Sequence, residues 1–403
     1  MAAGRLAIAG LGMLATPLYT RILPPEEYGK LVLAIALSAI AAAAPAQWLT
    51  GAILRFAPGA DPRSVRSRIV QSLPRNTVIG VLATVLPAII VLGGEWPLIA
   101  AVGAYGAVDG FFLTLWVTAR ARLSVGMYVV AGIARQAFAL LLAMLTGPPQ
   151  TTATYVMLCM LAGSAIATVL LAAGLRWGPS DAAETAPLSE WFAFGWPLVI
   201  NYLLLSSSLY VDRFLLNGQL GASAVGGYAA TYDLLYAFVT LPASLVGLAL
   251  VPKLYGTSDP SRRRDMLARL RRTVLVVSLG VAAVTLLVWP FVSRLLIGES
   301  VRMEGALVPV GLTVAFALNA IRFQLFNIIL QADLQTRRQT LITGIGLACN
   351  VGANLVAIPR LGITGAMLAT LMASLLAFVL AWASARTSSA RLATSFARSS
   401  EAT

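Results

Sequence analysis

Long apolar segments separated by short polar ones dominate the chain. Each apolar run has about 19–28 residues, which is enough for a helix to cross a hydrocarbon core roughly 30 Å thick. The pattern predicts twelve spans, at residues 4–23, 28–54, 76–94, 97–118, 126–146, 152–175, 191–216, 224–252, 273–297, 305–330, 340–358 and 361–385. The longest connecting segments, 176–190 and 253–272, are too short to hold a folded domain. We therefore predict an all-α, polytopic membrane protein.

Composition supports a membrane protein and excludes several kinds of chemistry. Hydrophobic residues make up 59% of the chain and charged residues only 11%, against roughly 25% charged residues in soluble domains. The chain has no histidine, and its two cysteines, Cys159 and Cys349, lie in separate apolar runs. Neither histidine-dependent catalysis nor a zinc or disulfide framework fits this inventory. With no phosphate-binding G-x-x-x-x-G-K-[ST] run and no long outer loop, we expect no enzyme, no cofactor and no metal.

Most of the 29 Lys and Arg residues fall in the segments on one side of the twelve predicted spans. Because basic residues accumulate in cytoplasmic loops, this asymmetry predicts that both termini are cytoplasmic. The net charge of +13 is then mainly a topology signal and a contact with anionic lipid, so we expect no nucleic-acid partner. The basic segment 262–272 has the same interpretation, and capture of an anionic lipid headgroup is its alternative.

The chain contains an internal repeat. Residues 20–23 (TRIL) recur as 212–215 (DRFL), and further on Gly29 corresponds to Gly226. The Asp-Pro pair at 61–62 corresponds to the pair at 259–260. The common order of these matches predicts two six-helix halves in the same orientation, an arrangement found in transporters whose substrate site lies near the bilayer midplane. We divide the chain into an N-terminal lobe at 1–177, a cytoplasmic linker at 178–190, a C-terminal lobe at 191–386 and a cytoplasmic tail at 387–403.

Two motifs at equivalent places in the halves carry a family resemblance. They are residues 17–29 (PLYTRILPPEEYG) and 210–216 (YVDRFLL), the latter followed by Gly221, Val225, Gly226 and Tyr228. These runs resemble Wzx-type polysaccharide flippases, which belong to the superfamily of the MATE antiporters and the lipid II flippase MurJ. The resemblance extends over nearly the whole chain, including the twelve spans and the repeat of the lobes.

The resemblance implies a two-lobed, V-shaped fold in the bacterial inner membrane. It implies alternating access, in which the lobes flip a polyprenyl-pyrophosphate-linked oligosaccharide destined for O-antigen, capsule or exopolysaccharide. The expected partners are this lipid-linked oligosaccharide and membrane lipids. A glycan polymerase is a candidate protein partner, and we expect a monomer.

Three arginines inside predicted spans are the candidate ligands of the pyrophosphate, because the guanidinium fork meets phosphate oxygens bidentately. Arg322 lies deep in its span, and the next helix offers Asn350 and Asn354 but no acid, which favours an anionic ligand. Arg213 belongs to the family-like motif, although a position close to its helix end would also let it reach the headgroups. Arg135 should lie at the depth of Asp109 on the preceding span, so a structural ion pair and a role in the cavity both stay open.

The acids inside spans define the alternative function. Asp109, Asp212 and Asp233 are candidates for ion coupling or for charge pairs with the arginines. A MATE-like exporter of small organic cations, driven by sodium or protons, would need such acids without a neutralising neighbour. Each of the three has an arginine in reach, whereas Arg322 has no acid, so we favour an anionic substrate.

Tyrosines at three positions of one span share a helical face. Tyr228, Tyr232 and Tyr236 are spaced four residues apart, so their side chains lie one above the other. They could offer rings and hydroxyls to sugars, or they could pack between helices. Both interpretations remain open from the sequence.

Overall fold

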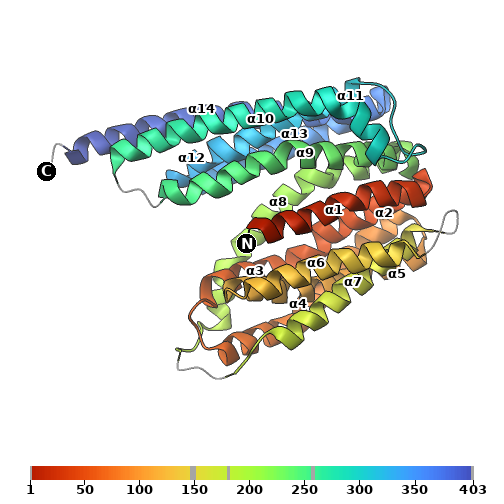
Figure 1. Cartoon of the computed structure of the whole chain (residues 1–403), viewed down its shortest axis with the longest axis horizontal. Coiled ribbons are helices and arrows are strands. Elements are labelled where there is room, and N and C mark those ends of the chain that lie inside the picture. Colours follow the sequence, from red (N-terminus) through yellow and green to blue (C-terminus); the bar gives the residue numbers. More distant parts are fainter. Residues whose placement is uncertain (1, 146–150, 179–181, 256–258, 401–403) are drawn as a thin grey trace. The chain divides into compact units, whose positions relative to one another are not determined.

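A computed structural model describes residues 2–145, 151–178, 182–255 and 259–400, and in these ranges the regular structure is entirely helical (Figure 1). The elements are α1 (Ala2–Ile22), α2 (Pro25–Leu37), η1 (Ser38–Ala42), α3 (Ala43–Phe56), α4 (Pro62–Leu92), α5 (Trp96–Ala121), α6 (Val125–Ala143), α7 (Ala153–Gly174), α8 (Leu188–Leu220), α9 (Ala222–Tyr255), α10 (Pro260–Leu296), α11 (Leu307–Ile321), η2 (Arg322–Phe326), α12 (Asn327–Ala332), α13 (Thr336–Leu361) and α14 (Ile363–Ser400). The elements η1 and η2 are single π-helical turns.

The helices confirm the predicted fold class. Because η1 joins α2 to α3 and η2 joins α11 to α12, the described residues form twelve continuous helical segments, one for each predicted span. Eleven of these segments are long and apolar enough to cross a membrane by length and composition, and α1 is the remaining one. The chain is therefore a multi-pass membrane protein.

The structure corrects the extent of two basic segments that the hydropathy pattern leaves outside the spans. The arginine-rich residues after each repeated Asp-Pro pair are the first turns of α4 and α10, and both helices begin at the proline. The carboxylate of Asp61 accepts a hydrogen bond from the backbone N–H of Ser64 at 2.9 Å, and that of Asp259 accepts one from Ser261 at 2.9 Å. Aspartate before a helix with proline at its first position is a favoured helix start. Hydrogen bonds from Ser261 also hold the pKa of Asp259 below its usual value.

The repeated glycines meet each other in space. A Cβ added to Gly29 would lie 1.8 Å from the carbonyl oxygen of Ala222, and one added to Gly226 would lie 2.7 Å from that of Pro25. The first turns of α2 and α9 therefore approach backbone to backbone, which only glycine permits on both sides. The repeat detected in the sequence thus has a packing reason at these positions.

Packing divides the chain into two compact units. The first comprises Met1–Gly227 and Gly298–Val301, and the second comprises Tyr228–Ile297 and Arg302–Thr403. The first unit includes α8, because Trp191 and Val199 of α8 join Trp48 and Leu49 of α3 in one buried cluster. The repeat lobes at 1–177 and 191–386 remain a prediction from the sequence. Residues 179–181 of the expected linker and 401–403 of the expected tail lie outside the described ranges, and α14 continues through most of that tail.

Candidate functional site

A partly buried ionic cluster lies in the first unit, where α5, α6 and α7 pack together. A guanidinium nitrogen of Arg135 lies 2.7 Å from Oδ1 of Asp109. The Arg135 Nε–H donates to the hydroxyl of Ser164 at 3.0 Å, and that hydroxyl donates to Asp109 at 3.2 Å. Arg135 also donates to the hydroxyl of Tyr105, and its guanidinium lies 5.0 Å from the ring centroid of Phe112. Nε and Nη2 of Arg135 thus have polar partners from the protein, and the ring of Phe112 lies beside the guanidinium.

A glycine brings the backbone of α7 close enough to build this cluster. A Cβ at Gly163 would lie 2.5 Å from the carbonyl oxygen of Arg135 and 3.1 Å from the backbone nitrogen of Ala139. Close approach of α7 to α6 at this level places the adjacent Ser164, which is fully buried, between Arg135 and Asp109. The predicted contact between Asp109 and Arg135 is therefore confirmed, while their roles in transport stay predictions.

The arginine of the second motif is also buried. Arg213 is 2% exposed and Asp212 is 3% exposed, and the guanidinium of Arg213 lies 4.8 Å from the ring centroid of Tyr210. The helix α8 continues to Leu220, two turns beyond Arg213, whereas the sequence placed the helix end within one turn. Arg213 is thus buried within the first unit, and its role at the substrate or near the headgroups stays a prediction. Asp233 lies on α9, in the second unit.

Arg322 is buried in the second unit at the first position of the π-helical turn η2. Its side chain is 5% exposed, its guanidinium lies 4.2 Å from the ring centroid of Phe323, and its Nε has no hydrogen-bond partner in the part of the chain that the structure describes. Within the described residues no carboxylate lies within ion-pair distance of it. At 1.5 Å per residue Arg322 is roughly 22 Å from the start of α11 and roughly 15 Å from the end of α12. Arg322 is thus buried in its helix with no acid nearby among the described residues, and its role toward a substrate stays a prediction.

The π turn has a local hydrogen-bond signature at this arginine. The backbone N–H of Asn327 donates to the carbonyl oxygen of Arg322, five residues earlier. Single π turns of this kind are frequent at functional sites because they displace side chains from the regular helical face. No feature of the sequence indicated this turn.

Amides of the second unit are buried but incompletely bonded. Asn354 donates to the side-chain oxygen of Asn350 at 3.0 Å, and its own Oδ1 has no hydrogen-bond partner among the described residues. Asn327 is 2% exposed, and within the same ranges its amide nitrogen has no partner either. Asn350 and Asn354 thus bond to each other rather than to Arg322. The unmatched polar atoms on α12 and α13 are places where water or a polar ligand would gain hydrogen bonds.

The three spaced tyrosines lie on α9 and pack within the second unit. Tyr228 is fully buried and Tyr232 is 4% exposed. Tyr232 and Tyr236 both meet the ring of Phe316 edge-on, at centroid distances of 4.7 and 5.4 Å. This geometry favours the packing interpretation for Tyr228 and Tyr232, whereas Tyr236 is only partly buried. Contact with sugars stays a prediction.

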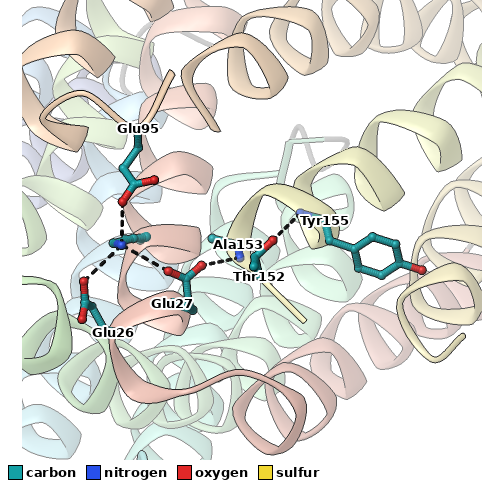
Figure 2. A network of polar contacts seen from close by, with 7 residues as sticks. Glu26, Glu27, Glu95, Thr152, Ala153 and Tyr155 are labelled. Carbon is teal, nitrogen blue, oxygen red and sulfur yellow. Dashed lines mark hydrogen bonds and ion pairs between the residues drawn. The ribbon is translucent and has the colours of Figure 1, made fainter. Parts of the chain in front are cut away.

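Sequence reasoning missed a network around Lys30, which Figure 2 shows. Its ammonium lies 3.1 Å from the carboxylates of both Glu26 and Glu27 and 2.7 Å from that of Glu95. The second oxygen of Glu27 accepts the backbone N–H of Ala153 at 2.8 Å. The network therefore ties α2 to the starts of α5 and α7. The spacing of Glu26, Glu27 and Lys30 was visible in the sequence, but the contact with Glu95 depends on the fold. No group of acidic or cysteine side chains in the described residues is arranged to hold a metal ion.

Comparison with solved structures defines the class of fold. The chain is similar to a multidrug resistance MATE family transporter of the MOP superfamily in its inward-facing conformation, at 14% identity and a TM-score of 0.69, covering 96% of this chain and 95% of that one. It is similar to the lipid II flippase MurJ at 11% identity and a TM-score of 0.70, covering 96% and 87%. A MOP superfamily transporter from Pyrococcus furiosus matches at 16% identity and a TM-score of 0.55, covering 97% and 92%. The fold is that of the MATE and MurJ transporters.

A match of the sequence to a family model shows the family of the chain. The family model described as polysaccharide biosynthesis protein matches residues 1–255, and the chain belongs to that family. A search of curated proteins finds no match.

Proposed function

We propose that the chain flips a polyprenyl-pyrophosphate-linked oligosaccharide across the bacterial cytoplasmic membrane by alternating access. Membership of the polysaccharide biosynthesis family and the fold shared with a lipid flippase support this proposal. The proposal includes two cytoplasmic termini, as the distribution of arginines predicts.

The burial of Arg322 without a nearby acid among the described residues is the observation that favours an anionic substrate. A charged arginine at the centre of a bilayer costs at least about 2.5–3.5 kcal/mol. Among the described residues no carboxylate within ion-pair distance offsets that cost for Arg322, and the side chain is buried in a helix long and apolar enough to cross a membrane. A pyrophosphate would offset it, because charge-assisted hydrogen bonds from a guanidinium to phosphate are short and strong. We assign Arg322 to the substrate headgroup, with Arg213 as a second candidate ligand.

The cluster around Asp109 supports the same choice. An exporter of organic cations would need an acid that is open to its substrate or coupling ion. The carboxylate of Asp109 is instead 2.7 Å from Arg135 and accepts a hydrogen bond from Ser164. The MATE-like alternative draws on the fold shared with a multidrug transporter, and this internal neutralisation weighs against it.

The experiment replaces Arg322 in cells whose surface glycan depends on this protein. Arg322→Ala should abolish the surface glycan while the protein stays in the membrane at near-normal abundance, and Arg322→Lys should retain part of the activity through its charge. Arg360→Ala is the matched control, because Arg360 is exposed in the last turn of α13. Full glycan in the Arg322→Ala strain would remove the assignment. Resistance to cationic dyes that depends on Asp109 or Asp233 would favour the exporter.

A further inference from the structure

A basic pocket lies at the first turns of α4, apart from the ionic cluster described above. It has a volume of about 480 Å³ and is lined by Arg63, Arg66, Ser67, Val70 and Trp177. Ligand sites in proteins commonly enclose roughly 300–1,000 Å³. The space is thus large enough for a small charged headgroup.

The residues of α4 that line the pocket lie on one side of the helix. The four lining residues of α4 follow at i, i+3, i+4 and i+7 from Arg63, so they form one stripe along the helix. The other face packs inward, where Val65 is 1% exposed and Ile69 is 2% exposed. This burial fixes the rotation of α4 and keeps the arginines directed outward.

The two arginines have no acidic partner among the residues that the structure describes. Both side chains are exposed, and neither forms an ion pair within the described part of the chain. Asp61, the acid closest in sequence, uses its carboxylate to cap the helix through the N–H of Ser64. The pocket therefore presents two positive charges and the Ser67 hydroxyl to a ligand.

Trp177 forms a fixed wall of the pocket. The guanidinium of Arg122 lies 5.5 Å from the ring centroid of Trp177. Nη1 of Arg122 also donates to the carbonyl oxygen of Arg176 at 2.5 Å. The indole also packs against the buried clusters that contain Val65 and Leu171. A tryptophan held in this way is typical of the membrane–water interface.

Polarity changes along α4 as it does across a lipid headgroup layer. Arg63 and Val70 are about 10 Å apart along the helix at 1.5 Å per residue, and the headgroup region of one leaflet is about 5–8 Å thick. Val70 is 55% exposed, and further along the same helix Val78 and Leu82 are 58% and 52% exposed. A ligand with an anionic head and an apolar tail fits this gradient better than a free anion does.

We propose that this pocket binds the phosphate headgroup of an anionic bilayer phospholipid. The two guanidinium groups meet the phosphate oxygens, the Ser67 hydroxyl donates a further hydrogen bond, and Val70 and Trp177 contact the glycerol and upper acyl region. The predicted orientation places the pocket on the cytoplasmic face, where basic clusters next to a span attract anionic lipid. The site holds a lipid of the surrounding leaflet and is independent of the transported substrate.

The test is native mass spectrometry of the purified full chain in detergent, titrated with phosphatidylglycerol and, in parallel, with phosphatidylcholine. The chain should prefer phosphatidylglycerol. Arg63→Gln/Arg66→Gln should weaken its binding about thirty-fold, which corresponds to about 1 kcal/mol for each arginine. Arg337→Gln/Arg338→Gln is the matched control, since it removes the same charge from exposed first-turn positions of α13 and should leave binding unchanged.

Further arms distinguish a lipid site from general charge attraction. Trp177→Leu keeps both arginines and should still weaken binding several-fold. Unchanged binding in both the arginine and the tryptophan variants would overturn the proposal, and so would an equal loss in the Arg337/Arg338 control. Complete displacement of phosphatidylglycerol by millimolar inorganic phosphate would show a simple anion site and would also overturn it.

Discussion

Replacing the partners of the ion pair between Asp109 and Arg135 tests how the helices of the first unit are held together. Removing one partner of a buried pair leaves an uncompensated charge, which costs about 3–5 kcal/mol. The side chains here are 14% and 22% exposed, and Ser164 stays bonded to whichever partner remains, so the lower end of that range applies. We expect Asp109→Asn and Arg135→Gln each to destabilise the protein by about 3 kcal/mol.

The double variant Asp109→Asn/Arg135→Gln removes both charges and leaves two groups that can still bond to Ser164. It should be more stable than either single variant, with a coupling energy of about 2–3 kcal/mol, the upper part of the range for groups in one network. Thermal unfolding in detergent measures this coupling, and membrane abundance and glycan export are recorded separately. Because Arg135 is bonded to Asp109, Ser164 and Tyr105 within the protein, we expect export to recover with abundance.

Two results would contradict a purely structural role for the ion pair. If the double variant is as unstable as the sum of the single variants, the pair does not stabilise the unit. If the double variant folds but does not export, the pair acts in transport, as a latch whose carboxylate releases Arg135 to the pyrophosphate.

Three smaller predictions concern helix starts, helix packing and topology. Asp61→Ala removes the cap of α4 and should cost about 0.5–2 kcal/mol in thermal unfolding, and no loss would contradict its capping role. Gly163→Ala places a methyl group against the backbone of α6 and should cost about 1–3 kcal/mol, whereas Gly352→Ala, with nothing within 4 Å, should be neutral or stabilising. Equal effects of the two glycine changes would show that the close approach is not needed. Reporter fusions after Arg122 should report the cytoplasm and those at Gly94 the outside, and the reverse pattern would invert the proposed topology.

The sequence predicts the helices well because membrane spans depend on length and hydropathy, which are local properties. It misplaces the starts of α4 and α10, since arginine-rich first turns have the composition of a loop although an Asp-Pro pair starts a helix there. A capping pattern at Asp61 and Asp259 was present in the sequence and would have found both starts.

Some contacts of the candidate site residues could be predicted from the sequence and others could not. Asp109 and Arg135 could be paired because antiparallel neighbours at equal depth must lie close together. The closing contacts of Ser164 and Tyr105 could not be predicted, because they depend on helix rotation and on the approach that Gly163 allows. The π turn at Arg322 likewise depends on packing around the helix rather than on local composition.

Lipid flipping by the purified protein in proteoliposomes is the direct test of the proposed transport. The probe is a fluorescent polyprenyl-pyrophosphate oligosaccharide, and its movement is followed by loss of accessibility to an external reagent. We expect flipping by the wild type, none by Arg322→Ala and a partial rate for Arg322→Lys. A wild-type protein that leaves this lipid in place but moves a cationic dye would instead be an exporter of cations, and the proposed function would be wrong.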